Sequence, residues 1–316
     1  MSGELTVVST FAGCGGSSLG YKWAGFRELL AIDFEPHAVE TFRLNFPDVD
    51  VWQADIRQVT SEAVLARCNI EQGELDVLDG SPPCQGFSTA GKRVVNDTRN
   101  DLAFEFIRLI EGLKPRAFVM ENVSGMAKGG MKGRFNQILA GLKATGYHVE
   151  VRKLNAMYYG VPQSRERIIF IGMRDGQEIK WPKRQKIVTA EEALRDCPFE
   201  KTPPFDDEYA KLWDRIKPGQ NASHVIGKGF NSCLKVNPKR PSPTIPKMQT
   251  GRGFGTICHW KEKRALSVAE AKRLMSFPDA FVIHGKYSKK WERLGNAVPP
   301  KMMQAIAECV KDVLDD

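Results

Sequence analysis

The chain has 316 residues, of which 42% are hydrophobic and 27% are charged, and its formal net charge is +8. This length can bury one large domain or two unequal ones, and no apolar run reaches the roughly 18 residues that a membrane span needs. The N-terminus lacks the pattern of a secretory signal. Seven scattered cysteines without a C-x-x-C pair argue against a disulfide framework or a metal site, so we expect free thiols in a cytoplasmic protein.

Residues 5–173 alternate between strand-like and helix-like patterns. In chain order, the sequence predicts strands at 5–11, 26–33, 49–55, 75–80, 116–122, 147–154 and 167–173. Helices are predicted between several of them, at 36–46, 61–68, 102–113 and 135–145, the last ended by Gly146. This order is typical of an α/β, doubly wound parallel sheet with helices on both faces.

The composition changes after about residue 175. Residues 176–262 are rich in Pro, Lys, Gly and Asn, which predicts a smaller, irregular domain. Two helices follow, one at 267–277 with a capping box of Ser267 and Glu270, and a final one at 299–314. The last helix has the apolar spacing of one that returns to the large domain.

The positive charge is concentrated in this irregular region. Residues 176–264 hold 18 Lys/Arg and 10 Asp/Glu, so the whole surplus of the chain lies there. Between Arg215 and Lys261 there are nine basic residues and no acid. Such a stretch fits a face that binds a polyanion such as nucleic acid, although a solvated basic surface would give the same count.

A glycine-rich turn, "FAGCGGSSLG" (11–20), follows the first strand and opens a helix. Such a turn lets a ligand approach the backbone and the helix N-terminal amides. Asp33 and Asp55 end the next two strands, where they could hold ribose hydroxyls and an adenine amino group. A structural turn and two helix caps are the plainer interpretation. Together, the three features favour a cofactor that contains adenosine.

The stretch "SPPCQGFS" (81–88) places a cysteine, Cys84, just beyond a strand. Two prolines stiffen the chain before it, and Gly86 loosens the chain after it. A free thiol has a pKa of about 8.5, so a catalytic cysteine needs both activation and firm placement.

With "ENV" (121–123), "QSRER" (163–167), "RALSVAEAKRLMSFPD" (264–279) and "LGNAVPP" (294–300), these stretches closely resemble the bacterial type of DNA (cytosine-5) methyltransferases. The resemblance runs in order through nearly the whole chain. It implies a catalytic and cofactor-binding domain at 1–175, completed by 285–316, and a target-recognition domain at 176–284.

The resemblance implies a reaction and its catalytic residues. Cys84 would add to carbon 6 of cytosine, which activates carbon 5 for methylation. Glu121 would contact ring nitrogen 3 and the amino group, and Arg165 and Arg167 would contact the base carbonyl and support the pocket. A capping or salt-bridging acid and ordinary structural arginines are the plainer alternatives.

The resemblance also implies S-adenosylmethionine as cofactor and duplex DNA as substrate. The expected cofactor residues are Phe11, Ala12, Gly13, Gly15, Gly16, Asp33, Asp55, Ile56, Leu102, Asn296 and Val298. The expected DNA-binding residues are Ser88, Lys92, Arg93, Arg240, Lys247 and Arg252, of which the last three could equally be solvated or touch phosphates. The basic loop 86–99 would close over a flipped base.

One departure from the family pattern is Ser9, where an acid is common. It puts one hydrogen bond on the cofactor side in doubt. We expect a monomer that modifies DNA. A restriction endonuclease that acts on the same site without forming a stable complex is compatible with this function, but the sequence does not show whether one exists. Three alternatives stay open: a related enzyme acting on tRNA, a catalytically idle nucleic-acid binder, and a nicotinamide-linked dehydrogenase, which only the glycine turn suggests.

Overall fold

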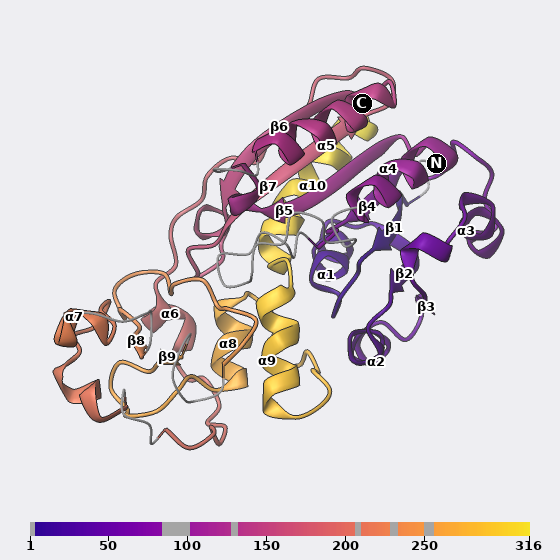
Figure 1. Ribbon diagram of the computed structural model, residues 1–316. Helices are drawn as coiled ribbons and strands as arrows, with labels where there is room; N and C mark the ends of the chain where they lie inside the picture. Colours follow the sequence, from indigo (N-terminus) through magenta and orange to yellow (C-terminus); the bar gives the residue numbers. More distant parts are fainter. Residues whose placement is uncertain (1–3, 84–101, 128–131, 206–209, 228–232, 250–255) are drawn as a thin grey trace. The chain divides into compact units, whose positions relative to one another are not determined.

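The chain forms two compact units (Figure 1). The computed structural model describes residues 4–83, 102–127, 132–205, 210–227, 233–249 and 256–316. The first unit consists of Met1–Asn155, Glu166–Lys183 and Met303–Asp316, and the second of Ala156–Arg165 and Arg184–Met302. Among the described residues, no helix has the length and apolar character needed to cross a membrane.

The first unit is built on a sheet of seven strands in the order β3-β2-β1-β4-β5-β7-β6. The strands are β1 (Thr6–Thr10), β2 (Arg27–Asp33), β3 (Asp50–Gln53), β4 (Val77–Gly80), β5 (Ala117–Val123), β6 (His148–Asn155) and β7 (Glu166–Met173). All seven predicted strands are present. The predicted α/β doubly wound fold is confirmed, with one exception in the direction of a strand.

That exception is β7, which runs antiparallel to both of its neighbours, β5 and β6. The sheet is therefore mixed rather than parallel. A parallel return needs a crossover of about a dozen residues or more, usually a helix. Between β6 and β7 lies only the segment 156–165, whose one helical piece is the 3-10 turn η6 (Ala156–Tyr158). The missing helix between these two strands was the sequence signal for an antiparallel pair.

Helices connect most of the parallel strands. They are α1 (Gly16–Trp23), α2 (Pro36–Asn45), α3 (Ser61–Cys68), α4 (Leu102–Leu113) and α5 (Lys132–Ala144), with the 3-10 turns η1 (Ile56–Gln58) and η4 (Ser124–Ala127). The helix α2 has a proline in its first turn, where the missing amide hydrogen costs nothing. The predicted stop of α5 at Gly146 is confirmed, because Gly146 has φ 87° just beyond the helix.

A large hydrophobic core lies between the sheet and the layer formed by α3, α4 and α5. Strand residues such as Leu78 and Phe118 pack there against Phe106 and Ile110 of α4, and all four side chains are fully buried. The rings of Phe106 and Phe118 meet edge to face with their centroids 6.2 Å apart. This apolar layer fixes the strands whose ends carry the candidate site.

The second unit contains short elements and long connections, as the composition of 176–262 predicts. Its elements are α6 (Ala190–Leu194), η7 (Ala210–Arg215), α7 (Ser223–Ile226), β8 (Leu234–Lys235), β9 (Ile257–Cys258), α8 (Val268–Leu274) and α9 (Tyr287–Asn296). A small core of Trp213, Ile216, Ala222, Cys233 and Cys258 lies beside the two-stranded β8–β9 sheet. The predicted capping box of Ser267 and Glu270 is confirmed at the start of α8.

The final helix, α10 (Pro300–Leu314), begins and ends as the sequence predicts. Its residues from Met303 onward belong to the first unit, where the Arg116 guanidinium donates to the Leu314 carbonyl at 2.6 Å. The preceding helix, α9, is not among the predicted elements. The functional division at residues 175 and 285 stays a prediction, because the two compact units are defined by contacts and not by activity.

Candidate active site

The glycine-rich turn between β1 and α1 is held in an unusual backbone conformation. Phe11, Gly13 and Gly15 have φ angles of 54°, 57° and 89°. A Cβ at Gly15 would lie 2.4 Å from the Phe46 ring, so no other residue fits there. By contrast, the nearest atom that a Cβ at Gly13 would meet among the described residues is the Phe11 carbonyl oxygen at 4.0 Å. Ala12 and Gly16 complete the turn, and Gly16 is the first residue of α1.

Asp33 at the end of β2 holds this turn in place. Its Oδ2 accepts a hydrogen bond from the Gly13 amide at 2.8 Å, and its Oδ1 accepts one from the Glu35 amide at 2.8 Å. Asp33 therefore accepts hydrogen bonds from backbone amides, as the plainer interpretation of a turn or cap residue predicts. Such a role does not exclude ligand binding, since each carboxylate oxygen can accept more than one hydrogen bond.

Asp55, the third predicted acid in this group, caps η1 and pairs with Arg57. The Arg57 amide donates to its Oδ1 at 3.1 Å, and the guanidinium contacts both oxygens. The hydrogen bond from Arg57 holds the pKa of Asp55 below its usual range. The neighbouring Ile56 is buried, whereas the Asp55 side chain remains 33% exposed.

The segment that leads to Cys84 is fixed at two points, although Cys84 itself lies outside the described residues. The Ser81 hydroxyl donates to the Phe11 carbonyl at 3.3 Å, which ties the end of β4 to the glycine turn. The Asn122 side-chain amide donates to the carbonyl of buried Pro82 at 3.0 Å. The motif "ENV" predicts a role only for its glutamate, so the sequence does not predict this contact of Asn122.

Glu121 and Arg167 form a buried ion pair in the first unit. Glu121 lies near the end of β5, and Arg167 lies near the start of β7 on the antiparallel neighbour. Their side chains are only 10% and 11% exposed, and the Arg167 Nε contacts the Glu121 Oε1. Because Glu121 pairs with Ile169 in the ladder, Arg167 is its diagonal neighbour on the same face of the sheet.

Arg165 has different partners from Arg167. Its guanidinium donates to three backbone carbonyls of the second unit, those of Ile245 at 3.2 Å, Gly295 at 2.7 Å and Ala297 at 3.1 Å. The side chain is almost fully buried. The stretch "GNAVP" with Asn296 and Val298 is thus anchored by Arg165. Leu102, another predicted cofactor residue, is the first residue of α4.

Comparisons with known proteins agree with this arrangement. The family model for C-5 cytosine-specific DNA methylase matches residues 5–312. The chain belongs to this family.

Relatives of the methylase are similar along most of their length. The Type II methyltransferase M1.HphI of Haemophilus parahaemolyticus is 35% identical over 329 residues, which cover 97% of this chain and 87% of the relative. The Type II methyltransferase M.Eco47II of Escherichia coli is 32% identical over 343 residues, which cover 98% and 79%. These matches, with the family model, make the chain a DNA (cytosine-5-)-methyltransferase.

Solved structures share the fold of the methylase. A putative DNA modification methyltransferase encoded within an E. coli prophage has a TM-score of 0.77 at 25% identity, with 99% of this chain and 100% of that chain covered. The DNMT2 of Spodoptera frugiperda has a TM-score of 0.71 at 18% identity, with 97% and 99% covered. The second likeness concerns the fold alone.

Two of the predicted DNA-binding residues of the methylase can be located. Arg240 and Lys247 are exposed in the second unit, and Arg240 lines a groove of about 380 Å³ together with Lys235, Asn237 and Thr244. The four others, Ser88, Lys92, Arg93 and Arg252, lie outside the described residues. The backbone at Lys247 packs closely on α9, because a Cβ at Gly295 would lie 2.5 Å from the Lys247 Cα.

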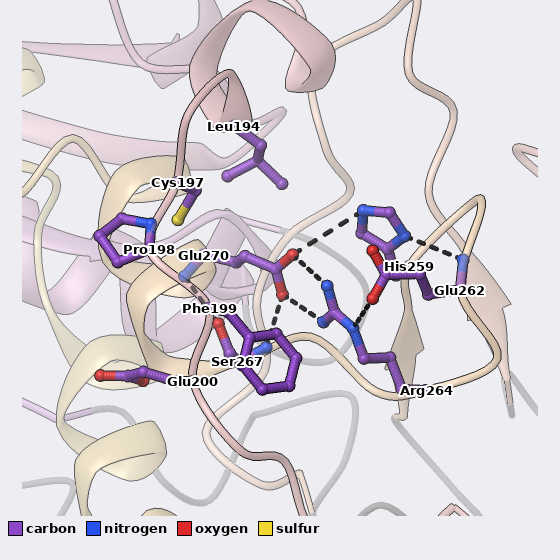
Figure 2. Close-up of a pocket in the computed structure, with 10 residues that line it drawn as sticks. All are labelled: Leu194, Cys197, Pro198, Phe199, Glu200, His259, Glu262, Arg264, Ser267 and Glu270. Atoms are coloured by element: carbon purple, nitrogen blue, oxygen red, sulfur yellow. Dashed lines mark hydrogen bonds and ion pairs between the residues drawn. The ribbon is translucent and has the colours of Figure 1, made fainter.

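The methylase also has a smaller, polar pocket of about 160 Å³ in the second unit, apart from every predicted site residue (Figure 2). Arg264 donates to both carboxylate oxygens of Glu270, at 2.7 and 2.8 Å, and to Glu262 at 2.6 Å. Burial lowers the pKa of His259, which faces Glu270 across 3.8 Å. The charged groups of this pocket are paired with one another, and Glu270 holds the start of α8. We therefore assign the pocket a structural role.

Proposed function

We propose that the enzyme transfers a methyl group to carbon 5 of cytosine within one short duplex DNA sequence, with S-adenosylmethionine as methyl donor. We further propose that it belongs to a type II restriction-modification system, with an endonuclease that acts on the same site. The names of its relatives support this assignment. The observation that carries the mechanism is the Glu121–Arg167 pair beside the Asn122–Pro82 hydrogen bond.

This observation supports the mechanism because it links the segment before Cys84 to the strand that carries Glu121. Carbon 5 of cytosine is a poor nucleophile, and addition of a thiolate to carbon 6 makes it enamine-like. Cys84 is the proposed thiolate, and the segment just before it is hydrogen-bonded to the residue that follows Glu121. As the thiolate adds, negative charge develops at ring nitrogen 3, where Glu121 carrying a proton would donate a hydrogen bond and stabilise it. The ion pair with Arg167 would keep the Glu121 side chain in one orientation.

The glycine turn fits an adenosine-containing cofactor. Among the described residues, none crowds a Cβ at Gly13, which fits a ligand against the backbone, and no side chain of this part of the chain caps the amides at the start of α1. Asp33 and Asp55 provide carboxylates at the ends of the next two strands. S-adenosylmethionine, when bound, supplies an electrophilic methyl group. The protein would hold it through the turn, Asp33, Asp55 and Ile56, and through Leu102, Asn296 and Val298.

The basic region supports a DNA substrate. Nine basic residues and no acid occur between Arg215 and Lys261, and exposed Arg240 borders the 380 Å³ groove. Phosphates would be attracted by this charge, and arginine can read a guanine edge with two hydrogen bonds. Arg240, Lys247 and Arg252 are the proposed contacts in this region. Ser88, Lys92 and Arg93 would act in the loop that closes over a flipped cytosine.

The first experiment is the transfer of labelled methyl groups to mixed-sequence duplex DNA, with tRNA in parallel, followed by mapping of modified cytosines. We expect label at carbon 5 within one short DNA motif. Label in tRNA alone would keep the chemistry and overturn the substrate. Absence of label from both, with cofactor binding intact, would favour a nucleic-acid binder without activity.

The covalent step needs its own test. At the mapped site, the fluorine on carbon 5 of 5-fluorocytosine cannot be removed as a proton can, so the bond to the thiol should persist after methylation. We therefore expect a stable adduct that increases the protein mass. Cys84→Ala should abolish both the adduct and methyl transfer. Cys68→Ala is a matched control, because burial raises the pKa of that thiol to about 11 and makes it a poor nucleophile. An adduct in Cys84→Ala would refute the assignment.

A further inference from the structure

The helix α1 (Gly16–Trp23) buries three polar side chains, in addition to the apolar side chain of Leu19. Ser17, Ser18 and Tyr21 are 6%, 1% and 0% exposed. A helix that covers a sheet usually does so with an apolar stripe, and buried hydroxyls need hydrogen-bond partners. The contact between α1 and the sheet is therefore directional, and it specifies the rotation of the helix more closely than apolar packing would.

Two carboxyl groups accept hydrogen bonds from these hydroxyls. The Tyr21 hydroxyl donates to the Asp79 Oδ1 at 3.3 Å, and the Ser17 hydroxyl also hydrogen-bonds to Asp79. The Ser18 hydroxyl donates to the Glu28 Oε1 at 2.9 Å. Asp79 lies on β4 and Glu28 on β2, the two strands that flank β1. The first helix is thus attached on both sides of the central strand.

Both carboxyl groups are in surroundings that favour the protonated form. Burial raises the pKa of Glu28 to about 7 and, with the nearby charge of Glu28, raises the pKa of Asp79 well above its usual range. Neither carboxyl has a lysine or arginine partner among the described residues. The Glu28 Oε2 is shielded from solvent and also lacks a hydrogen-bond partner in the described part of the chain. Glu28 and Asp79 are therefore neutralised by protonation and not by a lysine or arginine side chain of the described residues.

Asp79 also lies on the strand that leads to Cys84. Its carbonyl accepts a hydrogen bond from the Thr10 hydroxyl at 3.0 Å, one residue before the glycine turn. Two residues later, Ser81 bonds to the Phe11 carbonyl. The carbonyl of Asp79 is thus bonded to the end of β1, and Ser81 is bonded to the glycine turn. The side chain of Asp79 makes the contact to α1.

We propose that Asp79 is a positioning residue, which through Tyr21 and Ser17 fixes α1 and the glycine turn against β4. The distance between the segment that leads to Cys84 and the glycine turn is then held constant. The consequence for the cofactor rests on the proposed function, whereas the ordering of the turn does not. Asp79 acts through these hydroxyls and does not itself touch the cofactor.

The chain offers a matched control on the same strand segment. Asp76 precedes β4 and is also largely shielded, and it accepts hydrogen bonds from the Thr6 amide and hydroxyl at 2.8 and 2.9 Å. It binds β1 at the opposite end of the strand from the turn. A variant at Asp76 therefore removes a half-buried carboxyl, which is also paired with Arg116 at 2.8 Å, without touching α1.

The test measures amide hydrogen exchange in the full-length protein without ligand, and S-adenosylmethionine affinity by calorimetry. In Asp79→Ala we expect exchange at residues 13–20 to rise and cofactor affinity to fall about tenfold each, because the Tyr21 and Ser17 hydroxyls lose their acceptor. Asp76→Ala should leave both within about twofold, since its lost bonds lie outside this network. Asp79→Asn, which stays neutral and keeps an acceptor for Tyr21, should restore wild-type values.

Two results would overturn the proposal. One is equal exchange at residues 13–20 in Asp79→Ala and Asp76→Ala, which would reduce Asp79 to general stability. The other is a failure of Asp79→Asn to restore ordering of the turn. If the wild-type protein did not bind S-adenosylmethionine, the proposed cofactor would be wrong, and the exchange comparison would still decide the role of Asp79.

Discussion

Arg167 on β7 forms a buried ion pair with Glu121 on β5, and the antiparallel direction of β7 makes this pair possible. The register opposes Val123 to Arg167 and Glu121 to Ile169, so the two charges are diagonal neighbours on one face. The carboxyl that the proposed mechanism uses at the cytosine ring therefore has a fixed charge partner. This relationship leads to the first prediction.

Arg167→Ala should destabilise the protein by about 3–5 kcal/mol, because it leaves the Glu121 carboxylate buried without its partner. Glu121→Gln should cost less stability but lower kcat by about 10²-fold or more, because an amide cannot exchange a proton with the base. Denaturant unfolding and methyl-transfer kinetics measure the two effects. In the double variant the stability loss should be smaller than in Arg167→Ala alone. An additive loss would show that the pair is not coupled.

Asn122→Ala should lower kcat while leaving cofactor affinity unchanged. The substitution leaves the buried Pro82 carbonyl without its donor, at a cost of about 1–3 kcal/mol, and releases the segment just before Cys84. Asn122→Asp is the informative companion, because it keeps the acceptor for the Val123 amide and loses only the donor to Pro82. Wild-type kcat in both variants would contradict a positioning role for Asn122.

Arg165→Met should destabilise the second unit by at least about 3 kcal/mol, because three buried carbonyls lose a charged donor. Tryptophan fluorescence during denaturant unfolding would follow this loss, since Trp213 and Trp291 are buried in that unit. Arg195→Met, on an exposed arginine of the same unit, should change stability by less than about 0.5 kcal/mol. A variant of Arg165 that folds normally but loses kcat would instead assign the residue a direct catalytic role.

Glu28 should make stability depend on pH. Its pKa is about 7 in the folded protein, against 4.5 ordinarily, so the folded state binds more protons than the unfolded state between these values. The free energy of unfolding should therefore fall as pH rises from about 4.5 to 7 and then level off. At 1.4 kcal/mol per pKa unit the contribution is up to roughly 3 kcal/mol.

Glu28→Gln removes this titrating group and should flatten the curve. The difference in unfolding free energy between variant and wild type, measured by denaturant titration from pH 4.5 to 8, isolates Glu28 from Asp79, whose raised pKa acts in the same direction. The variant should gain stability relative to wild type as pH rises through this window. A difference that is constant across the window would show that Glu28 does not carry the extra proton.

The sequence by itself determined the order of strands and helices, the glycine turn, and the family. Local periodicity and backbone preferences act over short distances, so the strands from 5–11 to 167–173 could be placed without coordinates. The short motifs identify the reaction because its chemistry restricts the residue types that can perform it. The helix α9 was missed although Tyr287, Trp291 and Leu294 have helical spacing, because these few apolar residues stand among polar and charged ones.

Tertiary structure alone decided which distant side chains meet. Strand direction made Arg167, and not Arg165, the partner of Glu121, and Arg165 anchors carbonyls 80 or more residues away in the chain. The resemblance leads one to expect an acid at Ser9, yet the register pairs Ser9 with Asp79 on the next strand, which places a carboxyl beside that position. Such relations depend on register and strand order, which arise from contacts between segments far apart in the chain, and a sequence pattern read locally does not contain them.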